Sequence, residues 1–562
     1  MSCWPEGNKK KLLISFFLIS VSLLLGAHFF LENVLKDRLV DSESECPNSI
    51  FKISKLPQDE YHQRVFPFKH MTFSSLIESG NLKDIRKLKT NHYSLMIGSD
   101  PAGVSHHSKK KNWFYFSAKS NHSKAQKVKF YIHNLQYNWS MWKNGMVPVY
   151  KSALATNNTW SLLDTGNVKL IMKSKNIIMQ FHYNFTVGEE VSFALSFPYT
   201  LSQSQAFIEE TQARLANDTD IYFAKETLIK TNQNRNVDLV VLSSRKNITK
   251  FSIPKLKNLF PDRNQTMVQE TGVKLFSKRK KIVIVSARVH PSETASSYMF
   301  EGFLNSFLNK TQEVQEFLNE HVLVMIPVLN PDGVVNGFTR SDLNGLNLNA
   351  NYKLADLNTP SIYALKKMIR YMNQRNGVNF YLDFHSHFTK RAFFLFGNPI
   401  RQKNYRRILR FPFLVKNNEP EFSLSNSKFG SDKSDESTSR KEIYKYTKLK
   451  QIYTVEANYW GNVEDLRMLK SKKLIQNNLR IINDFKNFYR IEDFKRFGEK
   501  IAKSLIQNWR ITSGKMRNLR RNLHTEIDLY YKNLARKKIR QKNKAVAEAN
   551  LLRHNSSVTR LF

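Results

Sequence analysis

Cysteine is nearly absent from this chain of 562 residues, which contains only Cys3 and Cys46. These two residues flank an apolar segment near the amino terminus and lie far from any motif. A disulfide framework is therefore excluded, and so is a metal site built from cysteines. The same scarcity excludes a structural zinc finger and a cysteine nucleophile in the later part of the chain.

Acidic residues are scarce relative to basic ones. The chain has 47 Asp and Glu against 88 Lys and Arg, so its formal net charge is +41. A positive field of this size attracts nucleic acid, anionic lipid and acidic peptide. The chain is also rich in Lys, Asn, Phe and Ile together, as an AT-biased genome would encode. We therefore discount the charge as a guide to partners, and we do not expect nucleic acid to be one of them.

One uncharged run near the amino terminus, Leu12 to Leu31, has about the length that spans a bilayer. Lys9 to Lys11 precede it, and this charge bias would leave the amino terminus in the cytoplasm. Residues 1–50 are thus predicted to be a basic flank followed by a transmembrane signal anchor. We expect a single-pass membrane protein whose enzyme domain is lumenal or extracellular, with a cytoplasmic location as the alternative.

The remaining sequence divides into three parts by its texture. Residues 66–237 contain short runs rich in β-branched and aromatic residues, which predict an antiparallel β-sandwich. Residues 238–490 alternate continuous apolar strands with helical stretches, which predicts an α/β fold with a mainly parallel sheet. Residues 491–562 read as a helical tail rich in Lys and Arg. Such a tail is either a solvated extension or a binder of anionic surfaces.

Polar residues stand where the predicted strands of the α/β part end, which is where active sites form in open α/β sheets. Hydrolytic zinc sites use three His, Glu or Asp ligands and keep one position open. His290 and Glu293 follow one strand and His385 ends another, so a site for one Zn²⁺ per chain is predicted there. Asp383 is placed to orient an imidazole, and Glu456 suits the carboxylate that accepts a proton from water.

Four segments of the α/β part resemble the signature segments of M14 zinc metallocarboxypeptidases, namely SARVHPSETASSYMFEGFL, IPVLNPDGVVNG, LDFHSHFTKRAFFLFGN and YTVEANYWG. Within that family the chain is most similar to the cytosolic carboxypeptidase (tubulin deglutamylase-like) branch. The run WKNGMVPVY (Trp142 to Tyr150) resembles part of the N-terminal domain of that branch. The resemblance covers most of residues 66–490. It implies a carboxypeptidase-type mixed, mainly parallel sheet with helices, preceded by an antiparallel β-sandwich domain.

Carried over by position, the resemblance makes His290, Glu293 and His385 the zinc ligands. It makes Glu456 the general base and acid. The function that it implies is hydrolysis of C-terminal residues by a metal-activated water.

The resemblance also implies residues that handle the substrate. Arg340 matches the arginine that polarises the scissile carbonyl. Asn349 matches the asparagine that helps to hold the substrate carboxylate, and Arg440 matches an arginine near the substrate pocket. The next position departs from the pattern, because Ala350 stands where the family has a carboxylate-binding arginine. Loss of this bidentate contact is expected to weaken the enzyme.

Three functions remain open from the sequence. The first is an active zinc exopeptidase that trims acidic protein C-termini or polyglutamate side chains, tubulin-like if the enzyme domain is cytoplasmic. The second is a zinc-retaining pseudoenzyme that acts as a peptide-binding or membrane-anchored interaction protein, which Ala350 favours. The third is an adaptor that works through the basic tail. Intact metal ligands and an intact Glu456 favour the first.

Overall fold

The computed structural model describes residues 64–102, 111–136, 146–156, 159–173, 176–263, 272–430, 437–461 and 488–558. The predicted anchor, Leu12 to Leu31, lies outside these residues. Within them, the strands form two sheets near the amino-terminal end, one larger sheet of eight strands, and a two-stranded ribbon of β14 (Ile248–Ser252) and β15 (Lys274–Phe276).

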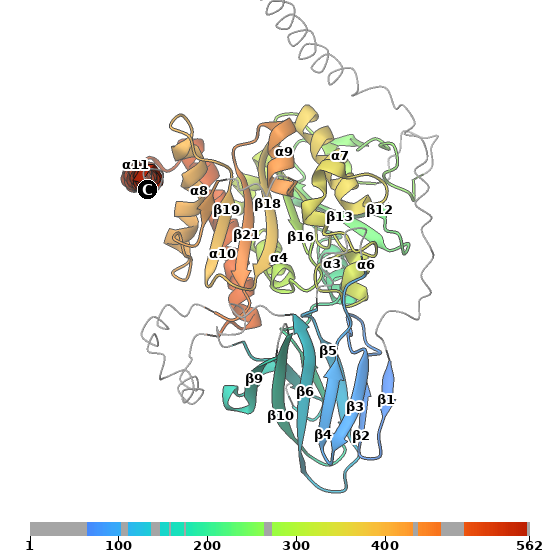
Figure 1. Cartoon of the computed structure of the whole chain (residues 1–562). Coiled ribbons are helices and arrows are strands. Elements are labelled where there is room, and N and C mark those ends of the chain that lie inside the picture. Colours follow the sequence, from blue (N-terminus) through green and yellow to red (C-terminus); the bar gives the residue numbers. More distant parts are fainter. Residues whose placement is uncertain are drawn as a thin grey trace, which may run out of the picture. The chain divides into compact units, whose positions relative to one another are not determined.

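The first two sheets face each other as a sandwich (Figure 1). In the long strand β6, Val128, Phe130 and Ile132 are buried while the residues between them are more exposed, as alternation across a strand requires. Phe130 meets Phe193 of the opposite sheet, with 5.3 Å between ring centroids. Neighbouring strands are antiparallel except for the pair β4 and β6. In spatial order the sheets are β1 (Val65–Pro67), β2 (Met71–Ser74), β5 (Tyr115–Ser120), β11 (Glu190–Ala194), β7 (Val149–Ser152), β8 (Ser161–Leu162), and β3 (Asp84–Lys89), β4 (His92–Met96), β6 (Gln126–Gln136), β10 (Asn176–Phe185), β9 (Val168–Lys173).

The eight-stranded sheet is mixed. Its four middle strands, β17, β16, β18 and β21, run parallel, and the strands next to them on the two sides, β13 and β19, run antiparallel to them. Every residue of β17 is buried, because helices cover both faces of a parallel centre. In spatial order the strands are β12 (Ile221–Lys230), β13 (Asn236–Ser244), β17 (His321–Ile326), β16 (Lys281–Ala287), β18 (Val378–His387), β21 (Ile452–Asn458), β19 (Phe393–Gly397) and β20 (Lys428–Phe429).

Two hydrophobic cores lie on the two faces of this sheet. Val283 and Val285 of β16 belong to the core that includes α4 and α10, whereas Ile282 and Ile284 belong to the core that includes α7 and α9. The helices are α3 (Leu201–Arg214), α4 (Ala295–Ser306), α5 (Gln312–Glu320), α6 (Pro331–Val335), α7 (Pro360–Arg375), α8 (Tyr405–Asn418), α9 (Ser439–Thr447), α10 (Ile491–Thr512) and α11 (Arg517–Val558), with short 3₁₀ turns η2 (Thr165–Asn167), η3 (Leu348–Ala350) and η4 (Tyr352–Leu354).

Helices α4 and α10 cross at two glycines. A Cβ atom added at Gly302 would lie 1.9 Å from the carbonyl oxygen of Lys495, and one added at Gly498 would lie 2.0 Å from that of Met299. No side chain fits at either position, so the two backbones touch. Helix α10 begins in the range that the sequence assigned to the basic tail, and it packs directly on the helix that follows Glu293.

Candidate metal centre and active site

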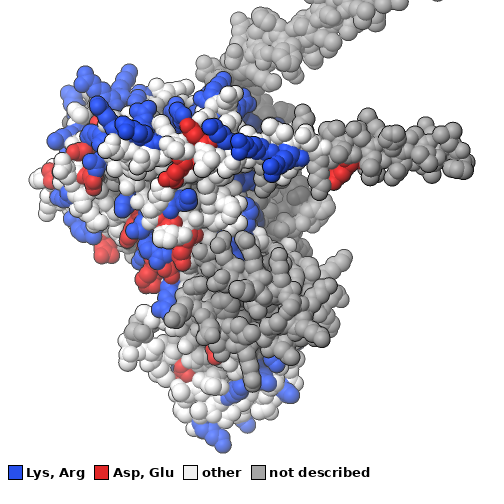
Figure 2. Space-filling view, turned by 90° about the vertical axis from the view of Figure 1, so that its left-hand side faces the viewer, with Lys and Arg blue, Asp and Glu red and all other residues white. Residues whose placement is uncertain are grey.

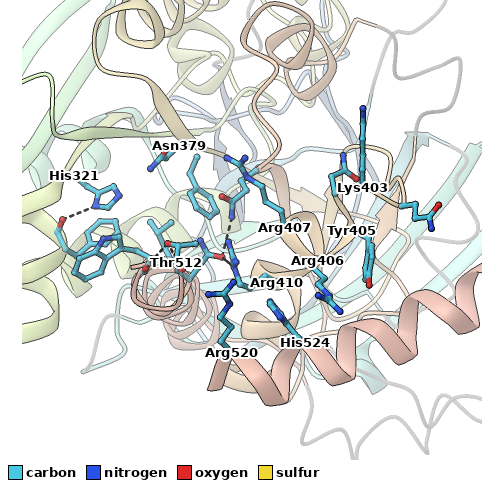
Figure 3. Close-up of a pocket in the computed structure, with 18 residues that line it drawn as sticks. His321, Asn379, Lys403, Tyr405, Arg406, Arg407, Arg410, Thr512, Arg520 and His524 are labelled. Atoms are coloured by element: carbon cyan, nitrogen blue, oxygen red, sulfur yellow. Dashed lines mark hydrogen bonds between the residues drawn. The ribbon is translucent and has the colours of Figure 1, made fainter. Parts of the chain in front are cut away.

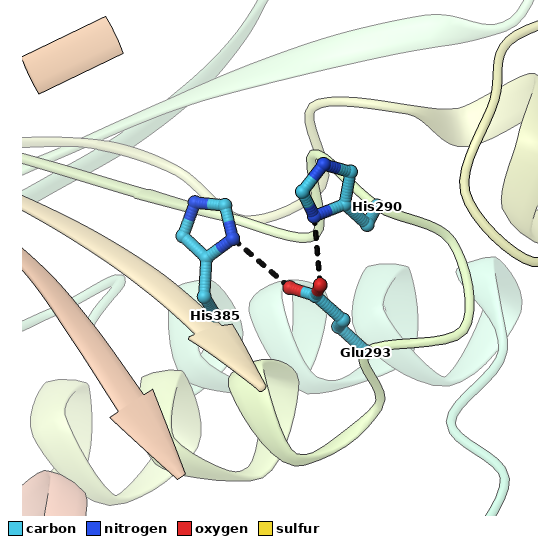
Figure 4. Close-up of side chains that lie close together, drawn as sticks. All are labelled: His290, Glu293 and His385. Atoms are coloured by element: carbon cyan, nitrogen blue, oxygen red, sulfur yellow. Dashed lines mark hydrogen bonds and ion pairs between the residues drawn. The ribbon is translucent and has the colours of Figure 1, made fainter. Parts of the chain in front are cut away.

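Three buried side chains meet at the carboxyl ends of the parallel strands. His290 and Glu293 lie between β16 and α4, and His385 lies near the end of β18. His290 Nδ1 is 2.7 Å from Glu293 Oε1, and His385 Nδ1 is 3.0 Å from Glu293 Oε2 (Figure 4). The three residues are at most 3% exposed, and their ligand atoms lie within 4.8 Å of one another. The structure thus brings together the three residues predicted from strand ends.

The protonation states of His290 and Glu293 suit a divalent cation. Burial and, to a lesser extent, the Arg340 charge lower the pKa of His290 to about 4, so its imidazole is neutral. Burial alone would raise the pKa of Glu293, but His290 and His385 hold it well below its usual range. A neutral imidazole and an ionised carboxylate are the forms that bind metal. Two imidazole nitrogens with one carboxylate, buried and free of cysteine, fit zinc among the metals.

Each of the two imidazoles contacts a second polar residue through its Nε2 atom. His385 Nε2 lies 3.1 Å from Asp383 Oδ2, the carboxylate that the sequence had suggested for this position. Asp383 itself accepts hydrogen bonds from Ser286 and Ser439, each at 2.7 Å. These contacts fix the ring so that Nδ1 faces Glu293.

His290 has an outer partner that sequence reasoning missed. Its Nε2 lies 3.0 Å from Asn347 Oδ1, in the segment that precedes η3. Asn347 stands only two residues before Asn349, so the repeated asparagines of that segment were the available signal.

Glu456 lies beside the cluster on β21. In the parallel register of β18 and β21, Glu456 pairs with His385. Its side chain is buried, and Oε2 has no hydrogen-bond partner among the residues that the structure describes. Burial raises the pKa of Glu456 to about 8. A carboxyl group with a raised pKa and a free oxygen can both accept and donate a proton near neutral pH.

Arg340 reaches the same cluster. Its Nη1 atom lies 3.6 Å from Glu293 Oε1 and 3.4 Å from His290 Nδ1, and its side chain remains 35% exposed. The guanidinium group therefore combines contact with the cluster and access from solvent, as a group that meets a substrate carbonyl requires.

The loop that carries Arg340 is held by Asp100, which follows the sandwich strand β4. Asp100 accepts backbone hydrogen bonds from Thr339 at 2.6 Å, and from Arg340 and Ser341 at 2.8 Å each. Its carboxylate is 2% exposed. Sequence reasoning did not find Asp100, because the ionisable residues of the sandwich follow no catalytic spacing.

The two residues predicted to bind the substrate, Asn349 and Arg440, lie on adjoining segments. Asn349 Oδ1 accepts a hydrogen bond of 3.3 Å from the backbone nitrogen of Ser439, the neighbour of Arg440. Arg440 is buried, and its Nη1 donates to the carbonyl oxygen of Gly397 at 2.9 Å. Ala350 ends the 3₁₀ turn η3 and is exposed.

Comparisons with known proteins agree with this geometry. Residues 208–459 match the family described as zinc carboxypeptidase, and residues 73–194 match the cytosolic carboxypeptidase N-terminal domain. The chain thus contains an M14 zinc carboxypeptidase domain preceded by a cytosolic carboxypeptidase N-terminal domain. Cytosolic carboxypeptidase 6 of Mus musculus is 28% identical over 381 residues, which cover 66% of this chain and 64% of that protein. Its Caenorhabditis elegans namesake is 28% identical over 403 residues, which cover 70% and 79%.

Solved structures of metallo-carboxypeptidases share the fold. The metallo-carboxypeptidase of Burkholderia cenocepacia aligns with a TM-score of 0.58 at 16% identity, covering 79% of this chain and 100% of that one. A metallo-carboxypeptidase from Pseudomonas aeruginosa, solved with (2-guanidinoethylmercapto)succinic acid, gives a TM-score of 0.57 at 17% identity, covering 77% and 98%. The predicted fold class, a carboxypeptidase-type mixed sheet after a β-sandwich, is confirmed.

The prediction of a membrane-anchored protein with a lumenal or extracellular enzyme domain is contradicted. The relatives of this M14 protein are named cytosolic carboxypeptidases, and its N-terminal domain matches that branch. None of the helices in the described ranges is apolar and long enough to cross a bilayer. The run Leu12 to Leu31, on which the prediction rested, lies outside those ranges. Hydropathy and flanking charge describe how a segment would behave in a membrane, and they do not establish that the chain is delivered to one.

Proposed function

We propose that this M14 protein is a zinc-dependent carboxypeptidase that removes C-terminal acidic residues, glutamate above all, from peptides or proteins. The observation that supports this most directly is the buried group of His290, Glu293 and His385 with Glu456 on the adjoining strand. The same chemistry extends to polyglutamate side chains, whose ends also carry a free carboxylate.

The roles of the residues follow from their positions. Bound zinc would supply Lewis acidity, which polarises a peptide carbonyl and makes a water molecule more acidic. Glu456 accepts a proton at its free Oε2 and returns it to the leaving amine. Arg340 donates hydrogen bonds to the carbonyl oxygen as negative charge develops on it.

An exopeptidase must also hold the free carboxylate of its substrate. The bond from Ser439 occupies the amide oxygen of Asn349, which leaves the amide nitrogen to donate to that carboxylate. We assign this role to Asn349, with Arg440 on the adjoining segment stabilising the same end of the pocket.

A preference for acidic residues follows from the cations near Glu456. Burial and the Lys428 charge lower the pKa of Lys390, whereas the Glu456 carboxyl group raises it. Together with Arg340, these lysines make the surroundings of the site positive, and glutamate is the side chain that such a site favours.

The test uses the purified full chain. We expect about one zinc per chain by metal analysis, and release of glutamate from a peptide that ends in glutamate. Glu456→Gln is expected to retain zinc and lose activity, and His385→Ala is expected to lose both. Wild-type protein without zinc would refute the assignment of the metal.

A second candidate is a zinc-retaining pseudoenzyme that binds acidic peptides. Ala350 favours it, because this exposed position lacks the arginine that the family uses to grip a carboxylate. Wild-type protein that binds one zinc and the glutamate-tailed peptide, yet releases no glutamate over hours, would support this candidate instead.

A further inference from the structure

A cavity lies at the opposite end of the parallel strands from the metal centre. Its volume is about 790 Å³, and it opens between α8, α10 and α11 at the amino ends of the parallel strands. His321 is the first residue of β17, Asn379 is the second of β18, and Gln451 directly precedes β21. The metal ligands stand at the carboxyl ends of the same sheet, so this cavity is separate from the proposed active site.

The lining of this cavity is strongly cationic. Lys403, Arg406, Arg407, Arg410 and Arg520 all contribute to it, and no Asp or Glu does (Figure 3). Figure 2 views the molecule from the side of α8 and α11, where Lys and Arg cover much of the surface of the α/β part. Like charges repel at this density, so a bound anion would relieve a destabilising arrangement.

One of these arginines has a carboxylate partner. Arg406 grips Asp528 through two hydrogen bonds, at 2.8 Å and 2.6 Å, and Tyr405 donates to the same carboxylate. Among the described residues, no carboxylate lies within ion-pair distance of Arg407, Arg410 or Arg520. Their charges therefore remain available to a ligand.

Arg410 is the deepest of the group, with only 8% of the residue exposed. Its Nε atom donates to Asn508 Oδ1 at 2.7 Å, and Gln451 approaches the same oxygen at 3.4 Å. The terminal nitrogens of Arg410 have no partner within the described ranges. Burying a guanidinium group without a carboxylate costs free energy, and Arg407 and Arg520 add repulsion to that cost. An anion at this position would satisfy the unpaired donors.

We propose that this cavity binds a small molecule that carries phosphate groups. Arginine pairs with phosphate through two parallel hydrogen bonds, and a cavity of this volume suits a small molecule. A phosphate group concentrates nearly two charges on one centre, whereas an acidic peptide spreads its charges one per residue along about 3.3 Å of chain. Three unpaired guanidinium groups around one cavity match the concentrated charge of a phosphate group. Phe380 and Trp509 give the cavity an apolar wall for an uncharged part of the ligand.

In the experiment, the zinc-loaded full chain is titrated with inorganic pyrophosphate at constant ionic strength. Calorimetry measures binding, and the melting temperature measures stability. We expect saturable binding and a rise in melting temperature with pyrophosphate, a smaller rise with inorganic phosphate, and none with chloride. Arg407→Gln and Arg520→Gln are each expected to raise the dissociation constant for pyrophosphate about tenfold or more. Zinc content is measured after each titration, so that removal of the metal is recognised.

Arg521→Gln is the matched control. It removes the same charge from the neighbouring position of α11, is exposed, and does not line the cavity. Equal weakening by Arg520→Gln and Arg521→Gln would overturn the proposal, because binding would then follow net charge alone. No saturable binding of pyrophosphate by a folded wild-type protein would also overturn it. So would a hexaglutamate peptide that binds more tightly than pyrophosphate and whose binding is weakened by Arg520→Gln. The effect of Arg520→Gln separates binding in the cavity from binding of the same peptide at the proposed active site. If a glutamine variant fails to fold, Arg407→Lys keeps the charge and still removes the bidentate contact, and it is expected to weaken binding while melting as the wild type does.

Discussion

Asp100 accepts a hydrogen bond of 2.8 Å from the backbone nitrogen of Arg340, whose guanidinium group lies 3.6 Å from Glu293. A residue of the β-sandwich thus sets the position of a side chain at the proposed active site. Because Thr339 and Ser341 bind the same carboxylate, the whole turn is held by a single side chain.

We predict that Asp100→Ala lowers kcat/KM about tenfold or more while zinc content stays at the wild-type level, because Arg340 loses its fixed position. Stability should fall by about 3 kcal/mol, since three buried N–H groups lose a charged acceptor. Asp100→Ala added to Arg340→Ala should lower activity little further. A large additional loss in the double variant would show that Asp100 acts through the fold alone.

Restoring an arginine at position 350 is predicted to raise activity. Ala350 is exposed at the end of η3, so Ala350→Arg adds a side chain without displacing a neighbour. A bidentate contact with the substrate carboxylate should raise kcat/KM on glutamate-tailed peptides about tenfold or more and leave the melting temperature unchanged. Leu354→Arg, at a position 73% exposed in the next turn, controls for added charge alone. An equal gain in both variants would mean that the position of the arginine does not matter.

Lys390 is predicted to select the substrate. Lys390→Gln should lower kcat/KM on a peptide that ends in glutamate several-fold more than on the same peptide ending in glutamine. The reason is that a cation near Glu456 is lost while the reacting groups remain. If kcat/KM on the two peptides falls by the same factor, Lys390 does not select the substrate.

The buried imidazole of His321 predicts a dependence of stability on pH. Burial, with smaller contributions from the charges of Lys280 and Lys281, lowers the pKa of His321 to about 4. The ring stacks on Phe317 at 4.2 Å and contacts its carbonyl oxygen at 3.0 Å. The unfolded chain binds a proton near pH 6.5 and the folded chain does not, so the free energy of unfolding falls as pH decreases from about 6.5 to about 4.

The total loss over that interval should be about 3 kcal/mol, since each pKa unit corresponds to about 1.4 kcal/mol. His321→Asn keeps a donor near Nδ1 and does not titrate. The difference between wild type and variant, measured by urea unfolding, should therefore shrink as the pH is lowered. If the difference in free energy of unfolding between wild type and variant stays constant between pH 7 and pH 4, His321 is not the source of the pH dependence.

The crossing of α4 and α10 predicts a steric effect. Gly498→Ala should destabilise the protein by about 3 kcal/mol, because its methyl group would meet the backbone of Met299, which cannot move aside. Gly430→Ala is the control, since a Cβ atom there meets nothing within 4 Å. Thermal unfolding of the two variants distinguishes a tight crossing from a general cost of replacing glycine.

The metal centre could be predicted from the sequence because its residues are polar and stand at the ends of apolar strands. This pattern is visible in the sequence without any knowledge of packing. His290, His385 and Glu456 were all reached in this way. Asp100 was not, because its role depends on a contact with a turn more than 200 residues away in the chain. Asn347 was missed for a similar reason, since several asparagines crowd that segment and only the fold selects one. The location was predicted wrongly from hydropathy, which carries no information on targeting.

The close crossing of α4 and α10 at Gly302 and Gly498 bears on where this chain can be shortened. Helix α10 lies beyond residue 459, where the match to the zinc carboxypeptidase family ends, so an alignment would treat it as dispensable. A chain that stopped at Arg490 would keep His290, Glu293, His385 and Glu456. It would also leave the apolar side of α4 facing water, directly after the turn that carries Glu293. Loss of function from a late stop codon would then arise through misfolding, with every residue of the proposed reaction still encoded.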